Sequence, residues 1–270
     1  IARNAARNVT TGTHNIAIGR AAGSAITTGS NSVAVGYQAL SFCSTGQINT
    51  AVGYYALNAA TSDNNVGIGR AAGQKITTGE RNIAVGYNPM GTSGGVAGAD
   101  NIGIGYDALE DLTSGAYNIG LGRNAGANIT TGESNVAVGY DALATATTGP
   151  RNVAVGFEAG KALTGAVNGT VSLGAYSRYL ATEGNFTIAI GNSAGQYYNA
   201  ANGIAIGSNS LVGASNGTTT GASNIGIGSF TGHTITTGIY NVFLGDRAGQ
   251  GVTTGGNNIG IGRDLSLIHI

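Results

Sequence analysis

Residues 30–40 read SNSVAVGYQAL, and variants of this stretch recur along the chain. Each variant ends its apolar part on a glycine, as in VAVG at 33–36 and IAVG at 83–86. The usual spacing between these closing glycines is 17 residues, and the longest insertions follow Gly86 and Gly207. A short fixed period predicts a repeat architecture in which each copy stacks on the next. The fifteen closing glycines are Gly19, Gly36, Gly53, Gly69, Gly86, Gly105, Gly122, Gly139, Gly156, Gly174, Gly191, Gly207, Gly228, Gly245 and Gly262.

Apolar and small residues alternate within the repeated stretch. The third residue before the glycine is Ile or Val in fourteen copies, with Thr50 the exception, and the last residue before it is always aliphatic. Between them stands Ala or Gly in thirteen copies, replaced by Ser172 and Phe243. A period of two with β-branched residues predicts a short strand, and we expect its Ile and Val side chains to point inward. The fourth residue before the glycine is Asn in eleven copies, which suits a corner because Asn tolerates left-handed backbone.

The second half of each unit often ends in Thr-Thr-Gly and is predicted to form a second strand that leads into a glycine turn. Two strands and two corners fill a 17-residue unit, which is a natural size for one coil of a solenoid. The prediction is therefore an all-β fold: a parallel β-solenoid, or β-roll, of about fifteen two-strand coils. At roughly 4.8 Å per coil the stack would be on the order of 70 Å long. The triplets lie at 10–12, 27–29, 77–79, 130–132, 147–149, 219–221, 236–238 and 253–255.

Residues 1–264 are predicted to form one repeat array, and the array is expected to be a fragment of a longer one. The chain starts at Ile1, and both ends of the array lack a polar cap. Residues 265–270, LSLIHI, break the pattern and are predicted not to belong to the native array.

The composition argues against several classes of function. The chain has 270 residues with 12 basic and 12 acidic side chains, and only 9% of its residues are charged, against about a quarter in ordinary domains. No cluster of Lys and Arg suits a nucleic-acid partner, and no apolar run reaches the length of a membrane span. His14, His233 and His269 occupy non-equivalent positions, and the GIGRAAG string at 67–73 is a repeat unit rather than a nucleotide motif. We therefore predict no enzyme and no catalytic, cofactor-binding or metal-binding residues.

The small residues between the aliphatic pairs are expected to face away from the Ile and Val side chains. One interpretation is a smooth strip against which another chain lies. The alternative is that small residues relieve crowding in a narrow coil. The column includes Ala17, Ala34, Ala51, Gly67, Ala84, Gly103, Gly120, Ala137 and Ala154.

Two further columns allow a binding and a packing interpretation. After the closing glycine come either Tyr with Leu, as at Tyr37 and Leu40, or Arg with Gly, as at Arg20 and Gly23. We interpret this exchange as compensated packing at a corner, and the alternative is a sugar-binding stripe. The Thr pairs could order water on an ice-binding face, or could bond up the stack. This Thr column is interrupted near residues 60, 95, 182 and 200. Glycosylation sequons occur at Asn8, Asn128, Asn168, Asn185 and Asn216.

The repeats resemble those of two groups of known proteins. NSVAVG at 31–36 resembles the NSVAIG-type repeat in the head domains of trimeric autotransporter adhesins. The units INTAVGYYALNAATSDNN at 48–65 and NVAVGYDALATATTGPRN at 135–152 are similar to repeats of phage and bacterial tail-fibre-domain proteins. The resemblance covers about residues 8–263 and implies a trimeric parallel β-roll. The unit of 17 residues is longer than the one usual in adhesin heads.

The resulting hypothesis is a structural or adhesive segment of an extracellular fibre, on a cell surface or a virion. Its expected partner is itself, as a homotrimer or a fibril, with cell-surface glycans or a host receptor as further partners. Two alternatives stay open: a fibril whose units stack end to end, with or without glycans, and an ice-binding solenoid that uses its Thr ladders.

Overall fold

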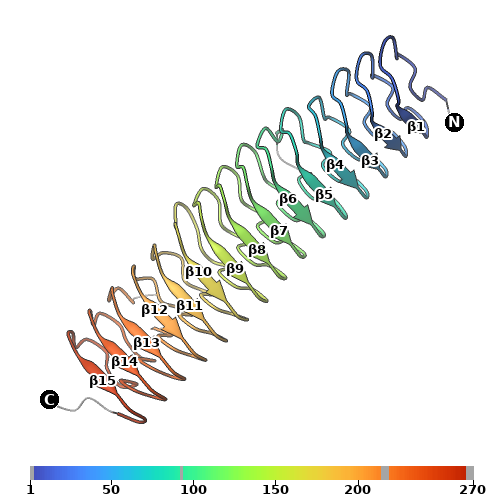
Figure 1. Cartoon of the computed structure of the whole chain (residues 1–270). Helices are drawn as coiled ribbons and strands as arrows, with labels where there is room; N and C mark the ends of the chain where they lie inside the picture. The colour runs from blue at the N-terminus through green and yellow to red at the C-terminus, as the bar shows by residue number, and fades with distance from the viewer. Residues whose placement is uncertain (1–2, 92–93, 214–218, 266–270) are drawn as a thin grey trace. The chain divides into compact units, whose positions relative to one another are not determined.

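The structure is a computed structural model that describes residues 3–91, 94–213 and 219–265. The chain forms two compact units, Ile1–Ser134 and Asn135–Ile270. Within the described ranges the regular elements are fifteen three-residue strands (Figure 1). The first unit contains β1 (Ile16–Ile18), β2 (Val33–Val35), β3 (Thr50–Val52), β4 (Val66–Ile68), β5 (Ile83–Val85), β6 (Ile102–Ile104) and β7 (Ile119–Leu121). The second contains β8 (Val136–Val138), β9 (Val153–Val155), β10 (Val171–Leu173), β11 (Ile188–Ile190), β12 (Ile204–Ile206), β13 (Ile225–Ile227), β14 (Val242–Leu244) and β15 (Ile259–Ile261).

Consecutive strands pair in parallel within each unit. In the first unit β1 pairs with β2 and the pairing continues in chain order to β7, and in the second unit it runs from β8 to β15. The register places equivalent residues of successive repeats beside each other, as in the pairing of Ala34 with Ala51. Each repeat is therefore one coil, and the predicted parallel β-solenoid is confirmed.

The predicted second strand of each coil is wrong. At residues 27–29 the three consecutive backbone N–H groups donate to a single acceptor, the carbonyl of Ser44, at N···O distances of 2.9, 3.2 and 3.3 Å. This geometry is not that of a β-strand. In a parallel ladder every second N–H group donates to the neighbouring strand, and each of them bonds to a different carbonyl. Outside the named strands the described residues contain one isolated bridge, between Ile76 and Val96. The Thr-Thr-Gly half of a coil is a series of turns that bond to the next coil.

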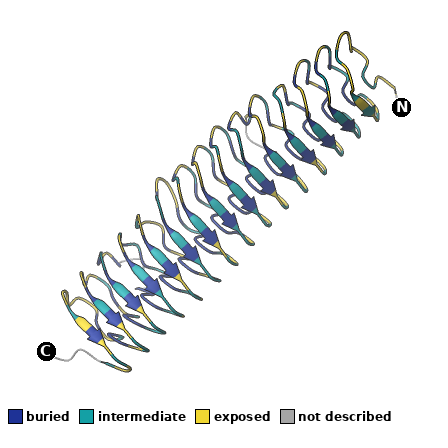
Figure 2. Ribbon diagram, viewed as in Figure 1, coloured by how far each residue is buried: buried dark blue, intermediate teal, exposed yellow. Residues whose placement is uncertain are grey.

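The predicted orientation of the strands is also wrong. The central small residues, such as Ala34 and Ala84, are fully buried, whereas Ile68 and Ile104 keep 41% and 40% of their surface exposed (Figure 2). The coil interior is narrow at most strands, since a Cβ added to Gly67 would lie 2.7 Å from Cγ of Leu57. The buried Phe243 of β14 is the exception, and Gly232 and Gly249 leave space beside its ring. The small residues therefore relieve crowding inside the coil, and the branched aliphatic side chains face outward.

Large core residues come from the turn that follows each closing glycine. Leu143 is fully buried there, and the third residue after it is the small Ala146. One coil earlier Gly126 stands in place of the Leu, and the third residue after it is the buried Ile129. Both backbones are left-handed, with φ of 49° at Leu143 and 63° at Gly126, and a Cβ on Gly126 would lie 2.9 Å from Cδ1 of Ile129. The exchange of Leu for Gly is thus compensated inside the core, and not by the Tyr or Arg beside it.

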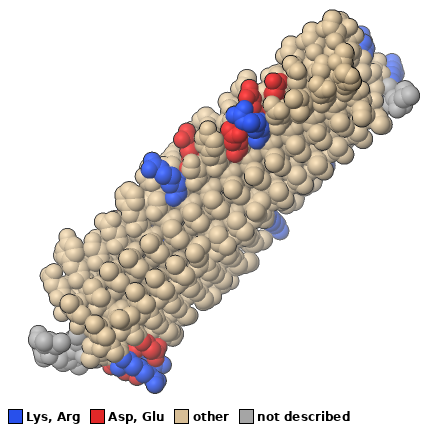
Figure 3. All heavy atoms as spheres, viewed as in Figure 1, with Lys and Arg blue, Asp and Glu red and all other residues tan. Residues whose placement is uncertain are grey.

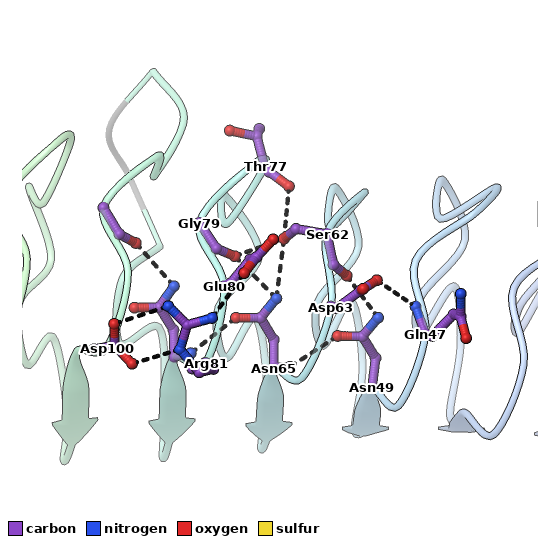
Figure 4. Close-up of polar contacts among 12 residues, drawn as sticks. Gln47, Asn49, Ser62, Asp63, Asn65, Thr77, Gly79, Glu80, Arg81 and Asp100 are labelled. Carbon is purple, nitrogen blue, oxygen red and sulfur yellow. Dashed lines mark hydrogen bonds and ion pairs between the residues drawn. The ribbon is translucent and has the colours of Figure 1, made fainter.

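A ladder of buried Asn side chains joins consecutive coils (Figure 4). The Asn65 side chain donates from Nδ2 to the carbonyl of Gly79 at 3.0 Å, and its Oδ1 accepts from the backbone N–H of Asn82 at 2.9 Å. Each Asn therefore ties the far corner of its own coil to the strand entrance of the next coil. The same two bonds recur at Asn82, Asn101 and Asn241.

The closing glycines form a second column of equivalent residues that joins consecutive coils. Gly36 has φ of +132°, a region that residues with a side chain rarely adopt. A Cβ on Gly36 would also lie 2.3 Å from the carbonyl oxygen of Gly53 in the next coil. Backbone conformation and close stacking both require glycine at this position.

The Asn ladder is interrupted in the second unit, and other buried donors take over its bonds. Thr170, Thr187 and Gly203 stand where Asn is expected. The Arg178 guanidinium donates to the carbonyls of Glu183 and Gly184 at one interrupted coil. At another, the Tyr198 hydroxyl donates to the carbonyl of Gly221 at 2.6 Å.

We predict that Asn101→Ala destabilises the protein strongly. The substitution leaves the buried carbonyl of Gly115 and the N–H of Asn118 without the partner that Asn101 provides. Each buried group left unpaired costs about 1–3 kcal/mol, so the urea midpoint should fall clearly. Asn128→Ala, at an exposed Asn of the same unit, is the control and should leave the midpoint unchanged. Equal midpoints for the two variants would contradict the structural role of the ladder.

We also predict that Gly126→Leu and Ile129→Ala compensate each other. Gly126→Leu alone overpacks the core, at about 1–3 kcal/mol, and Ile129→Ala alone leaves a cavity, at about 2–5 kcal/mol. Together they reproduce the native pair of Leu143 and Ala146, so the double variant should be more stable than either single variant. A double-mutant cycle from urea unfolding measures the coupling, and additive losses would refute it.

Candidate functional site

Each unit presents an exposed double row of aliphatic side chains along its strands. The rows consist of the first and third residue of every strand, which are partly or largely exposed while the central residue is buried in all strands except β1. None of the fifteen strands contains a charged residue. Figure 3 shows charged side chains mostly near the margins of the face in view, with broad uncharged areas between them. We call these rows the aliphatic face.

A ladder of aromatic rings and guanidinium groups follows the closing glycines of the first unit. Successive members contact one another face to face through the length of the unit. The contacts are Arg20 over Tyr37 at 5.7 Å, Tyr37 on Tyr54 at 5.2 Å, Arg70 over Tyr54 at 5.9 Å and over Tyr87 at 5.0 Å, Tyr87 on Tyr106 at 5.0 Å, and Arg123 over Tyr106 at 5.4 Å.

The stacking decides between the two interpretations of this column. The rings of Tyr87 and Tyr106 are nearly parallel, with an interplanar angle of 5°, and Tyr140 and Phe157 of the second unit stack at 9°. A sugar binds an aromatic side chain through the face of the ring, and in this ladder neighbouring residues cover the faces. The geometry favours packing along the coil corner over a sugar-binding stripe.

The Thr pairs divide into a bonded and an exposed column. The Oγ1 hydroxyl of Thr27 donates to the carbonyl of Ser44 at 3.0 Å, and Thr113 donates in the same way to Thr130 at 3.0 Å. The second Thr of the pair, such as Thr28 or Thr131, is exposed. Bonding up the stack is confirmed for the first column, and one exposed Thr column remains.

The described titratable groups are dispersed along the coils. His14 is exposed, and His233 is partly buried, which lowers its pKa. Lys161 contacts Asp141 Oδ2 at 2.8 Å and Glu158 Oε1 at 2.5 Å, and these bonds raise its pKa. Residues 3–91, 94–213 and 219–265 include no group of three or more His, Cys, Asp or Glu side chains that could hold a metal ion.

Most of the sequons lie in the described ranges. Asn8, Asn128 and Asn185 are exposed, and Asn168 is partly buried. The fifth sequon residue, Asn216, and also His269 and the tail residues 266–270 lie outside the described residues.

A polar cleft opens on the second unit where three successive coils depart from the repeat. Its volume is about 510 Å³, and its walls come from residues within the segments 164–167, 182–185 and 199–201: Thr164, Ala166, Val167, Thr182, Glu183, Gly184, Asn185, Asn199 and Ala201. Each of these segments replaces a Thr-Thr-Gly triplet. The interruption of the Thr column near residues 182 and 200 is visible in the sequence, but the cleft is not, because only the stacked coils bring the three segments together. We call this region the corner cleft.

Comparison with protein-family models and with curated proteins finds no match for the chain. In the described ranges no helix has the length and hydropathy needed to cross a bilayer.

Cys43 offers a chemical test of the core packing. Its side chain is fully buried, and burial raises the pKa of the thiol to about 11. Since the thiolate is the reactive form, Ellman's reagent should react slowly with the native protein, even at a pH near the ordinary thiol pKa of about 8.5. Reaction should be immediate in guanidinium chloride. Rapid labelling of the native protein would show that the coil around Cys43 is open.

Proposed function

We propose that the chain is a structural segment of an extracellular fibre, on a cell surface or a virion, with an adhesive role and no catalytic step. Copies of the chain associate through the aliphatic face as a homotrimer. The observation that carries this proposal is the uncharged and mainly aliphatic double row of side chains that the fold leaves partly or largely exposed along the strands.

The size of the aliphatic face supports an interface. A strand of three residues is about 10 Å long, and seven strands at about 4.8 Å spacing give the first unit a strip on the order of 330 Å². Apolar patches of about 300–600 Å² on soluble proteins are often functional. Further burial of exposed aliphatic surface contributes about 25 cal/mol per Å² to association.

The repeat itself favours a second copy as the partner. A row of side chains repeated at each coil is matched best by a surface with the same spacing, and another copy of the chain has that spacing. Closed cyclic assemblies are the common outcome when identical chains share one apolar face, and the resemblance to trimeric adhesin heads favours three copies. In a trimer the faces of all copies are covered around one axis.

The exposed Thr column supports a second candidate, an ice-binding solenoid. Thr11, Thr28, Thr131 and Thr237 keep their side chains at the surface with regular spacing. Thermal hysteresis at low protein concentration would favour this function over the structural one. Its absence, together with a defined oligomer, supports the fibre segment.

We predict that Ile104→Lys disrupts the oligomer while the coil stays folded. Ile104 is exposed on the aliphatic face, so a Lys there costs little in the monomer but brings a charge into the interface in every copy. Light scattering coupled to size exclusion should report three times the chain mass for the native protein and a lower mass for the variant. Tyr117→Lys, at an exposed corner outside the strands, is the control and should remain trimeric. A native protein that is monomeric, or grows into open-ended polymers, would contradict the proposal.

A further inference from the structure

The corner cleft has the chemistry of a binding site for a hydroxylated ligand. Thr164, Thr182, Glu183 and Asn185 line it, and they provide hydroxyl, carboxylate and amide groups. Asn185 Oδ1 accepts from the backbone N–H of Asn168 at 2.8 Å, which orients the amide and leaves its Nδ2 group without a partner among the described residues. Donors and acceptors therefore face one cavity from neighbouring coils.

Phe186 adds an aromatic surface next to the cleft. It follows the lining residue Asn185, and its side chain is 60% exposed. Its φ is 55°, a left-handed conformation that is strained for a bulky residue. The ring lies beside Gly169, where an added Cβ would be 2.9 Å from Cδ1 of Phe186. Among the residues that the structure describes, Phe186 makes none of the ring contacts that cover the aromatic ladder, so a ring face is open to a ligand.

The cleft wall is held rigidly from inside the coil. The Arg178 side chain is fully buried and donates to the carbonyls of Glu183, Gly184 and Tyr198. These bonds fix the backbone that carries Glu183 at the cleft surface. A wall that is ordered before binding lowers the entropic cost of holding a ligand.

We propose that the corner cleft binds a neutral saccharide, with one sugar ring against Phe186 and its hydroxyls bonded to Glu183 and Asn185. A sugar ring presents an apolar C–H face and polar hydroxyl edges, which matches an aromatic ring beside convergent polar groups. The exposed carboxylate of Glu183 disfavours anionic sugars. A volume of about 510 Å³ accommodates one or two sugar rings. This inference rests on the adhesive part of the proposed function and identifies its ligand class.

Saturation-transfer difference NMR on the full chain tests the proposal. The probes are glucose, galactose, mannose, N-acetylglucosamine and the anionic N-acetylneuraminic acid. At least one neutral sugar should receive saturation from the native protein, and the anionic sugar should receive none. Asn185→Ala and Phe186→Ala should each weaken binding about tenfold, which corresponds to about 1.4 kcal/mol.

Tyr117→Ala is the matched control. Tyr117 occupies the same place in its coil as Phe186, with φ of 61° and 61% exposure, but it lies in the first unit and not at the corner cleft. This variant should bind like the native protein, and an unchanged thermal midpoint would show that Asn185→Ala and Phe186→Ala remain folded. Absence of binding by every neutral sugar, preference for the anionic sugar, or equal effects of Phe186→Ala and Tyr117→Ala would overturn the proposal. The oligomeric mass is measured separately and tests the proposed fibre segment independently of the sugar-binding result.

Discussion

The buried hydrogen bonds between consecutive coils are the constraint on which the rest of the structure depends. The Asn side chain that precedes most strands satisfies a corner carbonyl of its own coil and an N–H of the next, as Asn65 does with Gly79 and Asn82. Both partners lie where water cannot replace the bond, so a shift of register would leave polar groups unpaired at every coil. The ladder therefore holds the strands in phase, and the phase aligns each side-chain column into a continuous surface.

One interruption of this ladder is Ser32 in the first unit, and the other three lie close to the corner cleft. Thr170, Thr187 and Gly203 remove three Asn side chains in succession, and Arg178 and Tyr198 supply buried donors instead. Such large donors need space, and glycine provides it: a Cβ on Gly203 would lie 2.3 Å from Cε1 of Tyr198. The same coils have lost their Thr-Thr-Gly corners. Departure from the repeat thus changes both the interior and the surface of the same coils, and the corner cleft lies on these coils.

Sequence reasoning located every strand and the parallel stacking, because the spacing of glycines and the alternation around them are local signals. It placed the wrong face of the strands in the core. The alternation of aliphatic and small residues separates the two faces of a strand but does not show which face is buried. The informative signal lay after the glycine, where Ala142 and Leu143 are consecutive and both buried. The Thr-Thr-Gly segments carried β-forming residues, yet convergence of their amides on one carbonyl prevented a strand. The corner cleft depends on three segments about 17 residues apart, so no single stretch of sequence could reveal it.

The narrow interior determines which side chains reach the surface of the coils. Because the residue beneath the strand is small in every coil except that of Phe243, the branched aliphatic residues are placed outside, and the aliphatic face repeats with the core. The corner residue before each Asn position is under no such restriction. The residue at this corner is exposed and has a left-handed backbone in one coil after another, but the residue type varies. It is His14 in one coil, Arg81 in another, and Phe186 in the coil beside the cleft. The side chains of this column vary from coil to coil without disturbing the ladder, so under the proposed function we place specificity for a partner at these corners rather than on the strands.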